Sequence, residues 1–236
     1  MNELLSAIDD ALRAQAKPDK APAMKAYMKS TMPYLGVASP QRKSICKDVF
    51  ARHPLPDADA WRTAARTLWD EATHREHRYV AIALASATRY KRFRDLDALP
   101  LYEHMIVDGA WWDYVDDVAI HLVGPLLLKA PQAMRPRMLE WSVDENLWRR
   151  RTSIICQIGT KGTVDLELLY ACITPSLDDK DFFARKAIGW ALRQVARHQP
   201  DEVLRYVRAH ADRLSGLSKR EALKHLLKRG DIDAVP

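Results

Sequence analysis

The sequence predicts an all-α protein built as a solenoid of paired helices. Three observations lead there: Gly is rare, with 8 residues; runs of alternating β-branched residues are absent; and apolar residues recur at helical spacing along the whole chain. With 236 residues, 47% of them apolar and 29% charged, the chain can bury a well-packed core, and no stretch resembles a linker. We therefore expect one domain over residues 1–236, with a generic helical bundle as the alternative architecture.

Helical periodicity and capping residues divide the chain into thirteen expected segments. In chain order they are residues 2–16, 22–32, 40–52, 58–69, 74–91, 96–107, 112–129, 132–141, 144–158, 164–174, 180–197, 200–210 and 218–229. Three starts carry the Ser/Thr-x-x-Glu pattern of a capping box, namely Thr73 with Glu76, Ser142 with Glu145 and Ser218 with Glu221. Ser39-Pro40 predicts another start. Gly124-Pro125 should kink or split its helix, because proline removes a backbone donor.

The spacing of the strongest amphipathic helices indicates a repeat. They begin near residues 74, 111, 145, 181 and 218, with a shorter helix between each pair. Helix pairs with a period of about 34–37 residues are typical of HEAT or armadillo solenoids. Asp116, Arg151 and Lys186 occupy equivalent places in three successive repeats. They could form a polar ladder facing a groove, or they could simply be surface positions that are polar by default.

Positive charge is concentrated near the end of the sequence. The formal net charge is +6, and residues 205–229 carry all of it. Eight basic residues lie there, against Asp212 and Glu221: Arg205, Arg208, Arg213, Lys219, Arg220, Lys224, Lys228 and Arg229. Such clustering favours a polyanionic partner bound through phosphate contacts. A solvated helix face is the alternative interpretation.

Cysteine usage and hydropathy predict a protein of a reducing cytosol. The three cysteines are Cys46, Cys156 and Cys172, which are widely spaced and form neither a disulfide framework nor a metal-binding CxxC pattern. The first fifteen residues are typical of an amphipathic helix and not of a signal peptide. No apolar run approaches the ~20 residues that span a bilayer. We expect a cytoplasmic protein without a membrane partner.

Aromatic residues next to charged ones are the first candidates for chemistry. Trp112 and Asp116 are four residues apart, so they share a helix face. An aromatic wall beside a carboxylate can stabilise a cation. Trp148 precedes a run of three arginines ending at Arg151, and Lys186 and Trp190 repeat the pairing of charge with tryptophan. Core packing is the competing interpretation for each tryptophan.

Two metal-site hypotheses have weaker support. His74 and His77 have a spacing that can bind a metal, but no third ligand is evident, and two surface histidines explain them as well. Asp113, Asp116 and Asp117 could form the metal site of a nuclease. They all come from one helix and lack the accompanying Glu-x-Lys pattern, so we expect no metal here. Gly-rich phosphate loops and nucleophile motifs are absent from the sequence.

Taken together, these motifs resemble the AlkD family of DNA alkylation repair glycosylases, which are built from HEAT-like repeats. The most specific are Trp111-Trp112-Asp113-x-Val115-Asp116, Asp144-x-Asn146-x-Trp148-x-x-Arg151 and Phe182-Phe183-x-x-Lys186-Ala187-Ile188-Gly189-Trp190. Matching positions extend from about residue 22 to 225. The resemblance implies an all-α, right-handed superhelical solenoid of HEAT-like helix pairs with a concave DNA-binding face.

The resemblance also assigns roles to single residues. Asp116 matches the catalytic aspartate, and Trp112 and Trp190 match the two tryptophans that hold the deoxyribose and backbone of the lesion. Arg151 matches an arginine that clamps the DNA backbone, and Tyr27 matches an aromatic residue lining the same cleft. Further phosphate contacts are expected from basic residues of the last repeats, namely Lys186, Arg193, Lys219 and Arg220.

The expected activity is that of a monofunctional DNA glycosylase in base excision repair. It would release cationic N3- and N7-alkylated purines such as 3-methyladenine and 7-methylguanine from double-stranded DNA, as a monomer and without a cofactor. Because an alkylated purine is already a good leaving group, the enzyme needs no general acid, although His121 lies near enough in sequence to be considered as one. The alternative is a non-enzymatic HEAT-repeat scaffold that binds DNA or protein.

Overall fold

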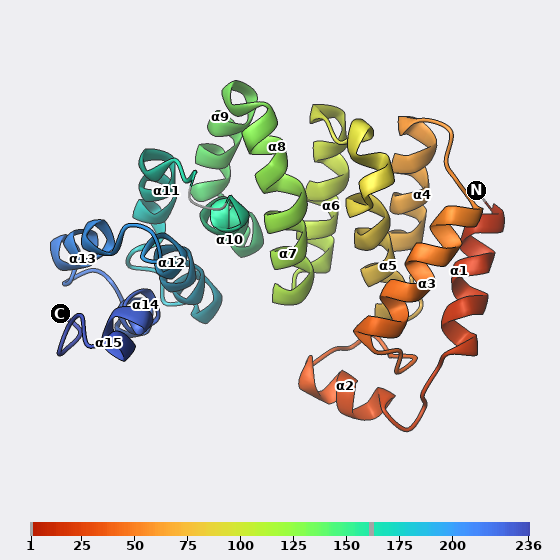
Figure 1. Ribbon diagram of the computed structural model, residues 1–236, viewed down its shortest axis with the longest axis horizontal. Coiled ribbons are helices and arrows are strands. Elements are labelled where there is room, and N and C mark those ends of the chain that lie inside the picture. Colours follow the sequence, from red (N-terminus) through yellow and green to blue (C-terminus); the bar gives the residue numbers. More distant parts are fainter. Residues whose placement is uncertain (1, 161–162) are drawn as a thin grey trace. The chain divides into compact units, whose positions relative to one another are not determined.

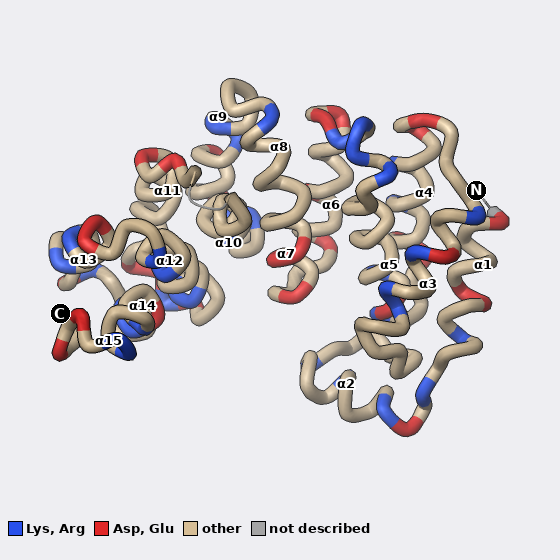
Figure 2. The backbone as a smooth tube through the Cα atoms, in the orientation of Figure 1, with Lys and Arg blue, Asp and Glu red and all other residues tan. Residues whose placement is uncertain are grey.

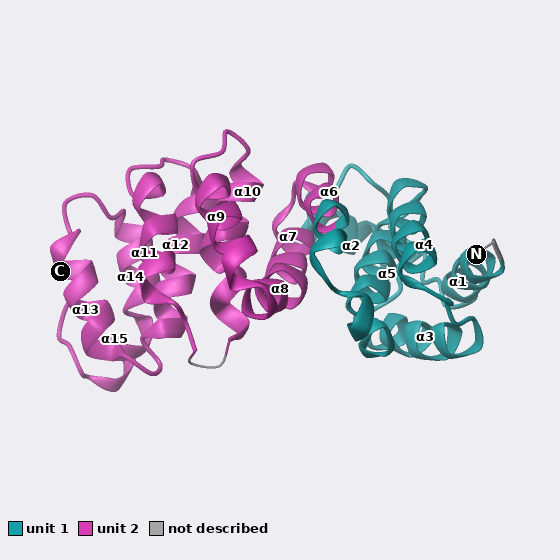
Figure 3. Ribbon diagram, turned by 90° about the horizontal axis from the view of Figure 1, so that it is seen from above, with its two compact units in different colours: residues 1–101 teal, residues 102–236 magenta. Residues whose placement is uncertain are grey.

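The computed structural model describes residues 2–160 and 163–236, and these residues form helices and connecting segments without any β-strand (Figure 1). The predicted all-α class is therefore confirmed, and the paired helices agree with a helical-repeat solenoid. The handedness of the superhelix and a concave face stay predictions. The chain divides into two compact units, residues 1–101 and 102–236, which Figure 3 shows in separate colours.

The described residues of the first unit, up to the start of α6, form five helices and two short 3-10 segments. Its elements are α1 (Asn2–Ala14), α2 (Ala21–Tyr27), α3 (Ser39–Arg52), α4 (Ala58–Asp70), α5 (Arg75–Ser86), and the 3-10 segments Thr88–Phe93 and Leu96–Ala98. Helices α1, α3 and α4 all pack against α5. Trp61 and Trp69 of α4 are fully buried in this core. Helix α2 has no buried residue and lies outside the core. Helix α6 (Leu99–Gly109) continues into the second unit.

Glu76 does not form the capping box that its spacing from Thr73 predicted. His74 is the N-cap of α5, and its backbone N–H donates to Nδ1 of His77. The Glu76 carboxylate is completely buried instead and accepts hydrogen bonds from three consecutive backbone N–H groups, those of residues 35–37. These bonds fix the segment that leads from α2 into α3. A buried charge needs several hydrogen-bond donors, and this segment supplies three of them to the carboxylate.

The second unit contains the remaining helices. They are α7 (Trp112–Val118), α8 (Gly124–Lys129), α9 (Pro131–Ser142), α10 (Leu147–Ile155), α11 (Leu166–Ile173), α12 (Phe182–Val195), α13 (Pro200–Ala209), α14 (Gly216–Ala222) and α15 (Lys224–Arg229). Helices α7, α10, α12 and α14 pack against one another in that order, and α9 and α11 pack beside α10. The starts of α5, α7, α10, α12 and α14 are 34 to 37 residues apart, as the sequence period predicted.

The predicted break at Gly124-Pro125 is present. Helix α7 passes into a π-helical turn, Ala119–Val123, and α8 begins at Gly124. A Cβ atom on Gly124 would lie 2.1 Å from the carbonyl oxygen of Cys156, so only glycine allows this approach. Proline lies within the first turn of α8, where its missing N–H is tolerated.

Two further capping predictions were wrong. Asn146 caps α10 in place of Ser142, and its Oδ1 accepts from the backbone N–H groups of Trp148 and Arg149. Ser215 caps α14 in place of Ser218, whose hydroxyl donates to the carbonyl oxygen of Arg185 in α12. In both cases the side chain that caps the helix lies within four residues of the predicted cap.

All three cysteines are reduced and buried. Burial raises the pKa of the Cys46 thiol to about 11 and that of Cys172 to about 12, and it also raises the pKa of Cys156. Cys156 and Cys172 pack against Met138 of α9, within the core of the second unit. None of the helices in the described part of the chain combines the length and apolarity that crossing a bilayer requires.

Candidate active site

Asp116 and Arg151 lie on neighbouring helices of the second unit. Helix α7 begins directly after Trp111, whose extended backbone ends the preceding loop. Helix α10 is fixed at its start by the Asn146 cap, and α7 packs against it. Asp116 is the fifth residue of α7, and Arg151 is the fifth residue of α10, one repeat later. The 35-residue spacing therefore places the two side chains opposite each other.

The Arg151 guanidinium binds both oxygens of the Asp116 carboxylate. Nε donates to Oδ1 at 2.7 Å and Nη2 donates to Oδ2 at 2.8 Å, which is the bidentate geometry of a strong, oriented ion pair. Nη1 donates to the carbonyl oxygen of Phe183 at 2.7 Å. One guanidinium thus links α7, α10 and α12. The Arg151 side chain is 4% exposed and that of Asp116 is 14% exposed, so solvent reaches the carboxylate and hardly reaches the arginine.

Burial raises the pKa of Asp116 above its ordinary value, because the charged carboxylate loses hydration. The hydrogen bonds and positive charge of Arg151 oppose this effect, and the nearby charges of Asp113 and Asp117 add to it. The result is a partly exposed carboxylate that accepts a proton more readily than an aspartate in water. Each oxygen also keeps a lone pair for a further donor, such as a water molecule.

An aromatic cluster lies next to the Arg151 side of this ion pair. Trp111, Trp148 and Phe183 pack together, with ring centroids 5.1 to 6.4 Å apart. The Arg151 guanidinium lies 6.0 Å from the centre of the Phe183 ring. Core packing is therefore the correct interpretation for Trp148, which is buried. The cluster joins the residue before α7 to α10 and to the start of α12.

The two tryptophans predicted to act in the site are partly exposed. Trp112 is the first residue of α7, one turn before Asp116 on the same helix. Trp190 lies in α12, one turn after Lys186. Both side chains therefore remain accessible for a ligand in the second unit.

The predicted phosphate-binding residues differ in their surroundings. Lys186 and Arg193 both pair with the Glu221 carboxylate, and Lys219 donates to the carbonyl oxygen of Ala211 at 3.0 Å. Arg220 is exposed on α14. Figure 2 shows lysine and arginine positions along α12, α14 and α15, and α14 packs against both α12 and α15. Contact of any of them with phosphate stays a prediction.

Glu221 is the residue that sequence reasoning missed. It had been interpreted as part of a capping box, although it lies 35 residues beyond Lys186 and so continues the series of Asp116, Arg151 and Lys186. Taking that register one step further would have identified it.

Tyr27 belongs to the first unit. It is the last residue of α2 and is 80% exposed, so its ring is open to solvent. Its participation in the site stays a prediction.

His121 lies beside Asp117, while Asp116 pairs with Arg151. Nε2 of His121 lies 3.7 Å from Oδ1 of Asp117, and both side chains are exposed. Each oxygen of Asp116 accepts one hydrogen bond from Arg151. His77 binds Asp9 through Nε2 at 3.0 Å. Within residues 2–160 and 163–236, no three His, Cys, Asp or Glu side chains are grouped so that they could hold a metal ion.

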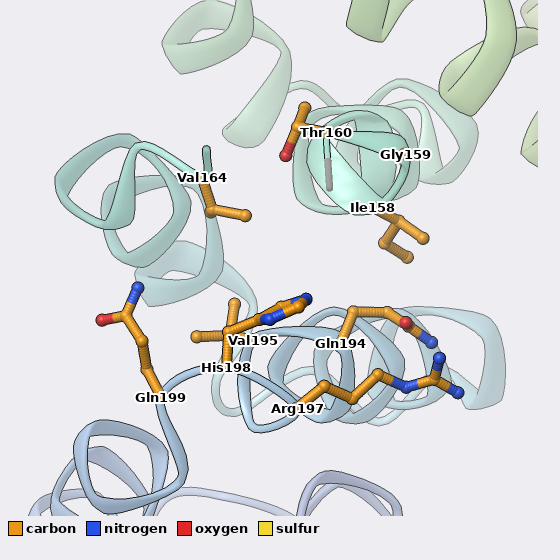
Figure 4. A pocket seen from close by; sticks show the side chains of 9 residues that line it. All are labelled: Ile158, Gly159, Thr160, Val164, Gln194, Val195, Arg197, His198 and Gln199. Carbon is orange, nitrogen blue, oxygen red and sulfur yellow. The ribbon is translucent and has the colours of Figure 1, made fainter. Parts of the chain in front are cut away.

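A separate pocket of about 380 Å³ lies between the 3-10 turn Cys156–Gly159 and the end of α12 (Figure 4). Its lining includes Thr160, Gln194 and His198, and none of the predicted site residues contributes to it. The Asp116–Arg151 pair therefore lies outside this pocket.

Known proteins agree with the family that the sequence motifs indicate. The profile of the family described as DNA alkylation repair enzyme matches residues 8–226. No curated protein matches the chain in sequence. Among solved structures, one described as a predicted DNA alkylation repair enzyme from Enterococcus faecalis is 28% identical, with a TM-score of 0.81, over 91% of this chain and 98% of that one. With nearly the whole sequence matched, the chain belongs to the DNA alkylation repair enzyme family.

Proposed function

We propose that the protein is a monofunctional DNA glycosylase that removes cationic N3- and N7-alkylated purines from duplex DNA. The observation that carries the proposal is the Asp116–Arg151 pair, a carboxylate that is oriented from behind and still reached by solvent. Partly exposed Trp112 stands one turn away on the same helix. Membership of the DNA alkylation repair enzyme family supports DNA as the substrate.

The chemistry follows from the charge of the lesion. Alkylation at N3 or N7 makes the purine cationic and weakens the glycosidic bond, so the base leaves as a neutral molecule without being protonated. As the bond breaks, positive charge develops on the deoxyribose. The negative charge of Asp116 stabilises that charge, and the faces of Trp112 and Trp190 add the attraction of their ring quadrupoles.

Asp116 also acts on the attacking water, as the acceptor of its proton. Its raised pKa makes it a better proton acceptor than an ordinary aspartate, and Arg151 keeps its oxygens in one orientation. In this mechanism Arg151 acts on the carboxylate first. Its low exposure makes contact with a DNA phosphate a secondary role that would require part of the ion pair to open.

The test is direct. Purified protein is incubated with a duplex that contains a single 7-methylguanine, and free base is measured by chromatography while the strand is checked for cleavage. We expect base release with an intact strand, because no lysine nucleophile is assigned to the site. DNA binding without release would favour the non-enzymatic scaffold, and strand cleavage that chelator abolishes would favour a metal-dependent nuclease.

A panel of lesions extends the test to the mechanism. If stabilising the sugar cation is sufficient, 3-methyladenine and 7-methylguanine are released. Uracil, hypoxanthine and 1,N6-ethenoadenine are not, because these neutral bases need a proton donor. Efficient release of uracil or hypoxanthine would contradict the mechanism.

A further inference from the structure

A second charged cluster of the same unit carries two cations on one carboxylate. Lys186 Nζ donates to Oε1 of Glu221 at 2.7 Å, and Arg193 Nη1 donates to Oε2 at 2.6 Å. The three residues form what we call the Glu221 cluster. The Lys186 side chain is 38% exposed and those of Arg193 and Glu221 are 19% and 14% exposed. The cations are thus within reach of a ligand from solvent.

The contact between α12 and α14 brings the carboxylate to the cations. A Cβ atom on Gly189 would lie 2.5 Å from Cβ of Glu221 and 2.8 Å from the carbonyl oxygen of Ser218, so α14 approaches α12 as closely as it does only because residue 189 is glycine. Ser218 adds a hydrogen bond from its hydroxyl to the carbonyl oxygen of Arg185. Glu221 is therefore held rigidly between Lys186 and Arg193.

Positive charge around the cluster exceeds what Glu221 can neutralise. Burial alone would raise the pKa of Glu221, but the hydrogen bond and charge of Lys186 and the charges of Arg193 and Lys224 hold it below its ordinary value. The same positive charge acts on the neighbouring His225, whose pKa is lowered. Burial lowers its pKa, and the charges of Arg197, Arg193, Lys224 and Arg229 lower it further. An anion placed here meets several cations and one competing carboxylate.

Carboxylate and phosphate oxygens compete for the same N–H donors. Lys has three N–H donors and Arg five, and each residue gives one to Glu221 in this cluster. A phosphate on the exposed side can therefore recruit the remaining donors and displace the carboxylate. A backbone phosphate carries one negative charge, as the carboxylate does, but the neighbouring phosphates of the duplex add to the attraction and favour the exchange. Glu221 has the advantage of being already in place.

We propose that Lys186 and Arg193 form a binding site for a backbone phosphate of DNA and that Glu221 occupies this site as an internal competitor. This inference rests on the proposed function, which makes DNA the ligand. The competition weakens binding to every duplex by a similar factor. It therefore keeps the protein from being retained on undamaged DNA, while the Asp116 site supplies recognition of the lesion.

The test measures binding without requiring catalysis. Affinity of Glu221→Gln for an undamaged duplex is determined by fluorescence anisotropy over a range of salt concentrations and compared with wild type. We expect tighter binding and a plot of log affinity against log salt that is steeper by about 0.9 for each cation released, up to about 1.8. Glu167→Gln is the matched control, because it removes one charge from an exposed carboxylate paired with Arg135. It should leave the slope unchanged.

A second set of variants shows whether Lys186 and Arg193 are responsible. In a Lys186→Ala/Arg193→Ala background, adding Glu221→Gln should change neither affinity nor slope. The proposal is overturned if Glu221→Gln binds no tighter with an unchanged slope, or if its gain persists without the two cations. Either result leaves release of 7-methylguanine by wild type unaffected, so failure of this inference and failure of the proposed glycosylase activity are distinguishable.

Discussion

The second unit contains two ion pairs that each join residues 35 positions apart, and their electrostatics are opposite. Asp116 pairs with Arg151, and Glu221 pairs with Lys186. Both carboxylates have side chains that are 14% exposed. Nevertheless the pKa of Asp116 is raised by its burial, whereas that of Glu221 is lowered because Lys186, Arg193 and Lys224 overcome the effect of burial. The same repeat register thus produces two different carboxylates.

The difference lies in the neighbours that each carboxylate has. Asp116 is desolvated, faces one cation and has two further aspartates nearby, so its pKa is above the ordinary value. Glu221 faces several cations, so its charge is favoured and it is a poor base. The first arrangement suits chemistry on a developing positive charge, and the second suits control of a phosphate-binding surface. Four variants or conditions test this contrast.

The largest effect is expected from Arg151→Met. It leaves the Asp116 carboxylate and the Phe183 carbonyl without their donors inside a closely packed region. Breaking a buried ion pair by removing one partner typically costs about 3–5 kcal/mol. Denaturant unfolding should show a loss of this size, against less than about 1 kcal/mol for Arg137→Met, whose guanidinium forms an exposed pair with Glu140. Equal losses for the two variants would mean that the buried pair contributes no more to the free energy of unfolding than the exposed pair.

Asp116→Asn should reduce the excision rate by about 10²–10³, the usual loss when an electrostatic contact to a transition state is removed. Because asparagine keeps an acceptor for Arg151, we expect the fold and most of the DNA affinity to remain. Single-turnover release of 7-methylguanine measures the rate, and circular dichroism checks the fold. Turnover at the wild-type rate would remove Asp116 from the mechanism.

Gly189→Ala affects the Glu221 cluster and leaves the Asp116–Arg151 pair alone. Its Cβ overlaps with Glu221 and Ser218, so α14 must move away from α12. Overpacking of this kind costs about 1–3 kcal/mol. Thermal unfolding should show the loss of stability, and the salt dependence of DNA binding should shift in the direction expected for Glu221→Gln. An unchanged melting temperature would show that α14 adapts without strain.

The smallest effect concerns the dependence of stability on pH. The raised pKa of Asp116 means that its contribution to stability grows as the pH falls through that pKa and is complete below the unfolded value of about 3.8. The contribution of Glu221 is complete above its unfolded value of about 4.5 and is lost as the pH falls through its lowered pKa. Unfolding free energies of wild type, Asp116→Asn and Glu221→Gln between pH 3 and 7 should show these opposite slopes. Parallel curves for the two variants would contradict the contrast.

Much of the fold could be predicted because helical periodicity and the repeat length are local properties. The start of α12 was predicted near residue 180–181 and lies at Phe182. The capping boxes failed for a tertiary reason. Glu76 is drawn to the N–H groups of residues 35–37 and Glu221 to Lys186, and these partners are 35 or more positions away in sequence. A four-residue pattern contains no information about them.

The site could be predicted in part for a related reason. Register places Asp116 and Arg151 in equivalent positions of successive repeats, but it cannot show that Nε and Nη2 bind both carboxylate oxygens. The link from Arg151 to the carbonyl oxygen of Phe183 involves a backbone group, which no residue pattern marks. The 35-residue repeat also marks Glu221, which follows Lys186 by one repeat, but the sequence pattern was interpreted as a helix cap instead.

The buried cysteines have a consequence for survival of the protein in the presence of electrophiles. Agents that alkylate DNA also attack thiols, and they react with the thiolate and hardly with the neutral thiol. With the pKa of Cys46 raised to about 11, roughly one molecule in ten thousand carries that thiolate at pH 7, and Cys172 is still less ionised. We therefore expect all three thiols to react slowly with such agents, which suits a member of a DNA alkylation repair family.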